Sequence, residues 1–212
     1  MNSNLVNMIK LKDILLESDE LNILLPRRSV ADRQKNYLVA IQRTIQNYIK
    51  NGGKGDLDLG NTPIETLPDN LTRVGGDLNL ENTSNLKKLP DKLIKVDGSL
   101  DLNGSHIQSL PDGLFVGDNL YLHDSHIKRL PAGLIVGNYL NLYGTLIKEL
   151  PDNLIVGGSL TVIASRLEKL PVGLKVMGDF FVSGTPLTQM YPKKELKKLL
   201  PGVEGDIRSD YD

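Results

Sequence analysis

Two histidines occupy equivalent places in the sequence and are the first candidates for a metal site. His106 and His126 each lie in a Ser-His-Ile triplet, 20 residues apart. If the chain repeats at that interval, adjacent copies place the two imidazoles about 5 Å apart, the spacing between neighbouring strands. A zinc site takes three or four protein ligands, and only Asp124 is near. We therefore expect two loop histidines that recur because the repeat was duplicated, with no metal and no cofactor.

The other groups of potentially reactive residues do not have the arrangement that catalysis or metal binding requires. His123-Asp-Ser125 contains the residue types of a catalytic triad, but a triad is a spatial arrangement that three neighbours in one loop rarely form. The chain has no cysteine, which removes thiolate nucleophiles and thiolate metal sites. A run of carboxylates lacks the spacing of a calcium-binding loop and is typical of a solvated face; it comprises Asp56, Asp58, Asp77 and Asp101. We therefore predict that the protein is not an enzyme.

Charge and composition exclude two classes of partner. The formal net charge is −1 and the pI is about 6.3, which lacks the basic footprint of a nucleic-acid-binding protein. No apolar run approaches the roughly 20 residues that cross a bilayer, so we expect no membrane partner. The first residues have no long apolar core and no cleavage site of a secretory signal. With the absence of cysteine, this favours a reducing, cytoplasmic location.

Apolar residues recur in columns about 20 residues apart. The first column consists of apolar pairs that flank one variable residue: Leu57/Leu59, Leu78/Leu80, Leu100/Leu102, Leu120/Leu122, Leu140/Leu142, Leu160/Val162 and Phe180/Val182. Further columns hold a single Ile or Leu, a Leu-Pro pair, a second Leu and a Val in almost every copy. One copy cannot bury these side chains alone, whereas stacked copies bury them in one continuous core.

Each copy predicts a short strand followed by an extended return. The apolar pairs alternate with polar residues, as in a half-buried strand. Twenty residues per copy and a proline in the return segment leave no room for a long helix, so that segment should be extended or a single tight turn. A glycine precedes each next strand, and we expect it to allow a positive φ there. These glycines are Gly75, Gly98, Gly117, Gly137, Gly157 and Gly178.

Over residues 55–192 these columns resemble the leucine-rich repeat family, closest to the bacterial and phage short type with about 20 residues and a Leu-Pro in each copy. The resemblance implies an α/β-class solenoid with short parallel strands on the concave face and an extended convex side. The family usually has an asparagine three residues after the second strand leucine, and these asparagines form a ladder that bridges backbone groups between coils. Here that position holds hydroxyl residues, which can also bond nearby backbone. These are Thr62, Thr83, Ser105, Ser125, Thr145, Ser165 and Thr185.

The two ends should close the solenoid. We predict an N-terminal helical cap over 1–52, repeats over 53–192, and a C-terminal cap helix with a polar tail over 193–212. The cap should contain a helix over Asn4–Glu17 and a second helix that starts with a capping box at Ser29 and ends at Gly52-Gly53. Its apolar face holds Leu38, Ile41, Ile45 and Tyr48. At the other end we expect a short helix over Pro192–Leu200 and a loose tail from Gly202.

The variable strand positions define a candidate interaction face of three columns. We call them the entry column (Asp56, Asp77, Ser99, Asn119, Tyr139, Ser159, Asp179), the central column (Asp58, Asn79, Asp101, Tyr121, Asn141, Thr161, Phe181) and the exit column (Gly60, Glu81, Asn103, His123, Tyr143, Ile163, Ser183). Early copies present carboxylates and later ones aromatic rings, which are common interface anchors. The predicted partner-binding residues are Tyr121, His123, Tyr139, Asn141, Tyr143, Ile163, Phe181, Asp58 and Asp101. The alternative is that exposed strands simply favour aromatic residues.

Three functions remain open at this point. The leading one is a non-enzymatic module that binds a protein partner through the concave face, by an apolar group beside Lys or Arg. The second is a virion-associated structural protein, because Leu11–Glu17 is similar to the leaders of some tailed-phage head proteins that are cut after Leu-x-Glu; a phage protein would act in the host cytoplasm. The third is a glycan-binding module, since Tyr and Asn on one face can stack on sugars and hydrogen-bond to them. The sequence leaves the oligomeric state open.

Overall fold

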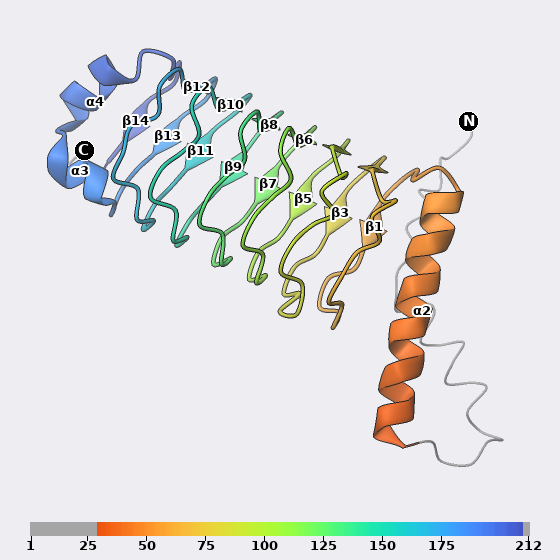
Figure 1. The fold of residues 1–212 in the computed structure, drawn as a ribbon. Coiled ribbons are helices and arrows are strands. Elements are labelled where there is room, and N and C mark those ends of the chain that lie inside the picture. Colours follow the sequence, from red (N-terminus) through yellow and green to blue (C-terminus); the bar gives the residue numbers. More distant parts are fainter. Residues whose placement is uncertain (1–28, 210–212) are drawn as a thin grey trace, which may run out of the picture.

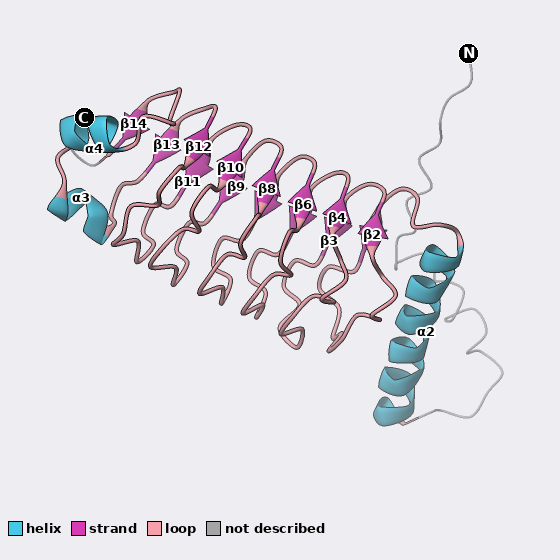
Figure 2. Cartoon of the chain, turned by 45° about the horizontal axis from the view of Figure 1, so that its top comes forward, coloured by secondary structure: helices cyan, strands magenta, loops and turns pink. Residues whose placement is uncertain are grey.

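The fold is a solenoid of stacked coils in a computed structural model, and the structure describes residues 29–209 of the chain. Each of the first six coils contributes one strand to each of two parallel sheets, and helices lie at both ends of the stack (Figures 1 and 2). This confirms the predicted solenoid of parallel strands with helical ends. The expected Asn4–Glu17 helix and the leader-like Leu11–Glu17 lie outside the described residues.

Sheet A is formed by the apolar pairs that the sequence places in strands. It has eight strands in the order β1-β3-β5-β7-β9-β11-β13-β14, all parallel to their neighbours. Its register follows the repeat, so that Leu100 pairs with Leu120 and Leu120 with Leu140. The strands are β1 Leu57–Asp58, β3 Leu78–Asn79, β5 Leu100–Asp101, β7 Leu120–Tyr121, β9 Leu140–Asn141, β11 Leu160–Thr161, β13 Phe180–Phe181 and β14 Ile207–Arg208.

The return segments form a second sheet, which is more order than the sequence predicted for them. Sheet B has six parallel strands in the order β12-β10-β8-β6-β4-β2 (Figure 2). Each of these strands ends at a buried valine, and the residue before the valine points outward. Each strand is only two residues long, too short for an alternation that sequence inspection could detect. The strands are β2 Arg73–Val74, β4 Lys95–Val96, β6 Phe115–Val116, β8 Ile135–Val136, β10 Ile155–Val156 and β12 Lys175–Val176.

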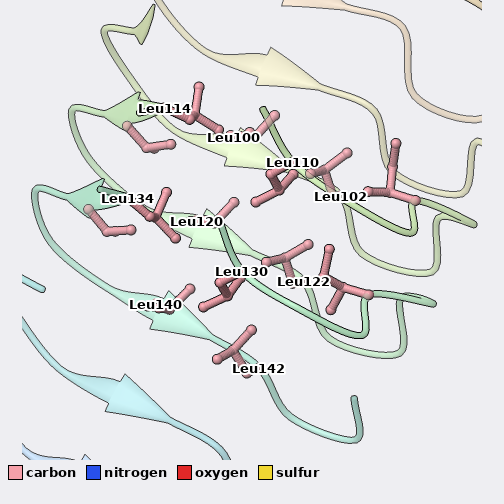
Figure 3. Close-up of a cluster of buried hydrophobic side chains, with 14 of the residues drawn as sticks. Leu100, Leu102, Leu110, Leu114, Leu120, Leu122, Leu130, Leu134, Leu140 and Leu142 are labelled. Carbon is pink, nitrogen blue, oxygen red and sulfur yellow. The ribbon is translucent and has the colours of Figure 1, made fainter. Parts of the chain in front are cut away.

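The core lies between the two sheets and consists of the leucine columns. Leu100, Leu120 and Leu140 stack along sheet A and are completely buried (Figure 3). The leucines before each proline, such as Leu110 and Leu130, also point inward and are buried. Burying a leucine side chain stabilises the folded state by about 1.5–3 kcal/mol, and each coil buries several. Stacking is therefore what holds each coil in place.

The glycines before the strands do not have the positive φ that we predicted from the sequence. Positive φ occurs instead in the turns, for example at Gly113 and Gly133. Before the strands, glycine is needed because adjacent coils come very close. A Cβ on Gly137 would lie 2.0 Å from the carbonyl oxygen of Gly117, and one on Gly157 2.1 Å from that of Gly137. These glycines are therefore fixed by contact between coils.

The buried hydroxyl residues act within their own coil and do not bridge coils. Thr83 Oγ1 donates to the carbonyl of Leu80 at 2.7 Å, and Thr145 Oγ1 to that of Leu142 at 2.8 Å. Each bond closes the turn that leaves a sheet A strand. The hydroxyls of Ser105 and Ser125 are buried and have no hydrogen-bond partner among residues 29–209. The hydroxyl residues thus do not take over the coil-bridging role of the family's asparagine ladder, and the side-chain bonds between coils are made elsewhere.

Helix α2, Val30–Lys50, covers the end of the solenoid next to β1 (Figure 1). The predicted capping box is confirmed: Asp32 N–H donates to Ser29 Oγ and the Asp32 carboxylate accepts from Ser29 N–H. Ile41 and Ile45 bury themselves against the first coil. The predicted end is also confirmed, because Gly52 and Gly53 follow the helix with φ of +80° and +62°.

The opposite end is closed by more structure than the sequence predicted. The expected helix is present as α4, Lys193–Leu199, preceded by a short α3, Pro186–Met190. The expectation of a loose tail is wrong for residues 203–208: β14 pairs with β13, and Ile207 is buried. The backbone groups of the last coil would otherwise stay unpaired, and the tail satisfies them. None of the described helices is long and apolar enough to cross a membrane.

Candidate interaction face

The entry, central and exit columns together form the outer surface of sheet A, which we call the sheet A face. All nine predicted partner-binding residues lie on it, in β1, β5, β7, β9 and β13, directly before β9, and in the segments that follow β7, β9 and β11. Every residue of the three columns is partly or fully exposed except Thr161, which is buried. Their periodicity alone was enough to group these residues.

Polar side chains of the entry column connect one coil to the next. We call this series the amide ladder: each side-chain oxygen accepts the backbone N–H of the equivalent residue in the following coil. Asp56 Oδ1 accepts from Asp77 N–H at 2.8 Å, Asp77 Oδ1 from Ser99 N–H at 2.7 Å, and Asn119 Oδ1 from Tyr139 N–H at 3.2 Å. These bonds perform the coil-bridging role that the sequence led us to expect from the hydroxyl residues.

A second series of bonds satisfies the N–H groups of the exit column. Asp58 Oδ1 accepts from Gly60 N–H at 3.1 Å, and Asp101 Oδ1 from Asn103 N–H at 2.9 Å. The two carboxylates that we predicted to bind a partner therefore also have a structural role. Their second oxygen atoms remain available, so this role does not remove them from the candidate site.

The aromatic residues cluster in the middle of the face. The rings of Tyr121 and Tyr139 meet edge to face, with centroids 6.2 Å apart. Partial burial raises the pKa of Tyr121, and the nearby carboxylates of Asp118 and Asp101 raise it further. Burial likewise raises the pKa of Tyr139, against the opposing effect of the Thr161 hydroxyl. Both phenols are therefore neutral donors at physiological pH.

Beside this cluster the surface is hollowed. An open depression of about 360 Å³ is lined by His123, Tyr139, Asn141, Tyr143, Thr161 and Ile163, and we call it the tyrosine hollow. Five of these six residues were predicted from the sequence. Thr161 was missed as a site residue because it is short and its column was judged by its aromatic and acidic members. Tyr143 is the most exposed of the tyrosines on this face, at 46%.

The sheet A face carries most of its carboxylates on the coils that precede the aromatic cluster. Its three columns contain the carboxylates of Asp56, Asp58, Asp77, Glu81, Asp101 and Asp179, and no Lys or Arg. A guanidinium from β14 lies at the C-terminal end of the face: Arg208 lies over the Phe181 ring and pairs with Asp179 at 2.9 Å. The N–H of Asp206, which donates to the Asp179 carboxylate, lowers the pKa of Asp179, and the hydrogen bond from Arg208 lowers it further. The guanidinium of Arg208 therefore partly covers Phe181.

Comparison with known proteins identifies no family and no curated relative. No protein-family model matches the chain, and no curated protein matches it. Among solved structures the chain is similar to one described as a Shigella effector LRR domain, with a TM-score of 0.47 and 18% identity over 95% of this chain and 99% of that one. The buried leucine columns and the stacked parallel strands of this chain establish its fold type. The fold is a leucine-rich repeat solenoid.

In this leucine-rich repeat solenoid the paired histidines do not converge on a metal. The rings of His106 and His126 stack in parallel, with centroids 4.2 Å apart and an interplanar angle of 9°. Their in-plane lone pairs therefore run side by side. Lys87 Nζ lies 3.1 Å from His106 Nδ1, which it engages as a donor. Partial desolvation lowers the pKa of His106, as do His126 and Lys87. Within residues 29–209 no group of three or more His, Asp or Glu could hold a metal ion.

Proposed function

We propose that this chain is a non-enzymatic module that binds a protein partner through the sheet A face. The tyrosine hollow carries the proposal, because it is an open depression with three large ring side chains at its edge. Tyrosine offers a large contact area at a low cost in side-chain entropy and is frequent among the residues that dominate binding energy. A partner that inserts an apolar or aromatic side chain would fill the hollow.

Charge defines the second requirement on the partner. Five of the six carboxylates of the sheet A face lie on the three coils that precede the hollow's coils, the nearest being Asp101 in β5, and no Lys or Arg of the three columns opposes them. A partner with Lys or Arg beside its apolar side chain would complement both parts of the face. We therefore expect association to slow as ionic strength rises, because charges of this kind mainly steer encounter.

The test is a pull-down from lysate with three matched proteins. We expect Tyr121→Ala/Tyr139→Ala/Tyr143→Ala to weaken binding at least 30-fold, which corresponds to the loss of one binding hot spot of about 2 kcal/mol. The control is Lys92→Ala/Lys128→Ala/Lys175→Ala, which changes three exposed lysines on the return side and should leave binding unchanged. A partner retained equally by the tyrosine variant would refute the assignment of this face.

A glycan ligand is the second candidate, because the rings of Tyr139 and Tyr143 and the amide of Asn141 line the same hollow. Aromatic rings can stack on sugars while an amide hydrogen-bonds to their hydroxyl groups. A glycan array distinguishes the two ligands. Saturable binding to one glycan class, lost in the tyrosine variant, would replace the protein partner.

We also propose that the repeat belongs to the bacterial and phage short type and that the protein acts in a cytoplasm. The 20-residue interval and the Leu-Pro of each copy support the first statement. The absence of cysteine supports the second. Fractionation of cells that express the protein tests the location, and recovery from the membrane or the medium would contradict it.

A further inference from the structure

In most coils the backbone N–H groups of the entry and exit columns have side-chain acceptors, but this pattern is interrupted in the coil that contains Ser159 and Ile163. The amide ladder links the entry column from Asp56 to Tyr139 and resumes where Ser159 Oγ accepts from Asp179 N–H at 3.1 Å. It is missing at one step. Tyr139 has no oxygen near its Cβ, so within residues 29–209 the N–H of Ser159 has no acceptor.

The exit column is interrupted in the same coil. Its N–H groups find side-chain acceptors as far as Tyr143, whose N–H donates to Asn141 Oδ1 at 3.0 Å. The next member of the central column is Thr161, which makes no such bond. The N–H of Ile163 therefore has no acceptor in the described part of the chain, and neither has that of Ser183, which follows Phe181.

Both interruptions border the tyrosine hollow. Tyr139, Thr161 and Ile163 line it, and Ser159 is the entry-column neighbour of Tyr139 in the following coil. Asp or Asn at positions 139 and 161 would continue the bonds made in other coils. With Tyr139 and Thr161 at these positions, two stabilising side-chain-to-backbone hydrogen bonds are not formed. Local departures of this kind concentrate at functional sites. An open N–H group needs an acceptor, which a bound ligand can supply.

We propose that coil 159–163 binds the main chain of an extended peptide segment of the partner, whose carbonyl oxygens accept from Ser159 N–H and Ile163 N–H while one apolar side chain enters the tyrosine hollow. The inference rests on the proposed function and specifies its ligand. Ser159 and Ile163 are four positions apart in the chain, which corresponds to about 13 Å in an extended conformation. Two carbonyl groups four positions apart in an extended peptide are separated by the same distance. The acceptor is a neutral carbonyl, because the carboxylates of this face repel an anionic group.

The test uses peptides and NMR. The probes are acetylated and amidated heptapeptides with a central Leu, Ile, Phe or Tyr and a Lys or Arg at one end. We expect a binding peptide to shift the amide signals of Ser159 and Ile163 and to slow their hydrogen exchange. If no peptide binds the wild-type protein at millimolar concentration, or if one binds without changing these two amides, the inference is overturned.

Two pairs of variants isolate the open N–H groups. Thr161→Asn supplies an acceptor for Ile163 N–H, as Asn141 does for Tyr143, and should weaken peptide binding about three- to tenfold. Thr161→Val leaves the N–H open and should bind within about twofold of wild type. Tyr139→Asn and Tyr139→Ala both lose the ring, but only the first closes Ser159 N–H, so it should bind more weakly and melt at a higher temperature.

The outcomes separate the inference from the proposed function. If a partner is lost with the triple tyrosine variant but binds equally well to wild type and Thr161→Asn, the sheet A face is the interface and the main-chain contact is wrong. If the partner is retained by the triple tyrosine variant, both proposals fail. Equal melting temperatures of Tyr139→Asn and Tyr139→Ala would also contradict the inference, because the ladder would not have been restored.

Discussion

At the scale of single residues, close contact between the backbones of adjacent coils limits which residue types this solenoid can accept. The glycines at 117, 137 and 157 lie where a side chain would collide with the carbonyl of the preceding coil. By contrast, the turn glycines Gly113 and Gly133 have room for a methyl group but have positive φ. The same residue type thus serves two different physical needs within one repeat.

Two alanine substitutions separate these needs. Gly137→Ala should destabilise the protein by about 3 kcal/mol, because the coils must move apart to admit the methyl group. Gly113→Ala should cost about 1 kcal/mol, since only the left-handed conformation is penalised there and nothing lies within 4 Å of the added carbon. Urea unfolding measures both. Equal losses would show that the coils can separate without strain.

Residue types on the candidate face were largely predictable, and their bonding was not. A period of 20 residues is sufficient to place Tyr121, Tyr139 and Tyr143 on one side of the molecule. Which N–H groups stay open depends on whether an oxygen atom of the same or the preceding coil can reach them. That is a matter of backbone position at the strand ends, and no column of residue types reports it.

At the scale of elements, the sequence predicted those strands that alternate over several residues and missed those that do not. Sheet A strands lie within Asp-Leu-Asp-Leu-like stretches, where alternation is evident. Sheet B strands expose one residue each, and its type varies from Arg73 and Lys95 to Phe115 and Ile135. Strand β14 was missed for a different reason, because it lies outside the repeat and is recruited by the unpaired edge of β13.

Strand β14 should stabilise the last coil. Ile207→Ala should lower the free energy of unfolding by about 2 kcal/mol, since this side chain is buried against the core. The N–H groups of Phe180 and Val182, which donate to the carbonyls of Asp206 and Arg208, should then exchange faster with solvent. Hydrogen exchange followed by NMR measures this. Glu204→Ala, at an exposed position, is the control, and unchanged exchange in both variants would mean that β14 contributes nothing.

At the scale of the whole molecule, stability comes from contacts between neighbouring coils. Each strand pairs only with the strands of the preceding and following coils, in both sheets. Stability then approximates a sum over coils and the interfaces between them. The two ends are the exceptions, since α2 and β14 each supply a surface that a further coil would otherwise provide.

An additional coil should therefore be accepted. Duplicating residues 119–138 after Asn138 keeps the 20-residue register of both sheets, in which Leu120 pairs with Leu140 and Phe115 with Ile135. The longer protein should fold, with a denaturant midpoint no lower than wild type and an m-value larger by about a tenth, because m scales with the surface exposed on unfolding. Urea unfolding followed by circular dichroism measures both quantities.

The matched control inserts only residues 119–128. This half coil puts sheet A residues opposite sheet B residues, so the columns no longer meet, and the protein should aggregate or unfold. If the half-coil protein were as stable as the full duplication, the coil would not be the unit of stability.

The strictly sequential pairing of the strands has a consequence for how the chain can be made. As the chain leaves the ribosome, each new coil finds its docking surface already completed by the coil before it, and it never has to wait for a distant segment. Helix α2 precedes the first coil in the chain and gives it a surface to pack on. Only the last coil must wait, because β13 stays open on one side until residues 203–208 have emerged.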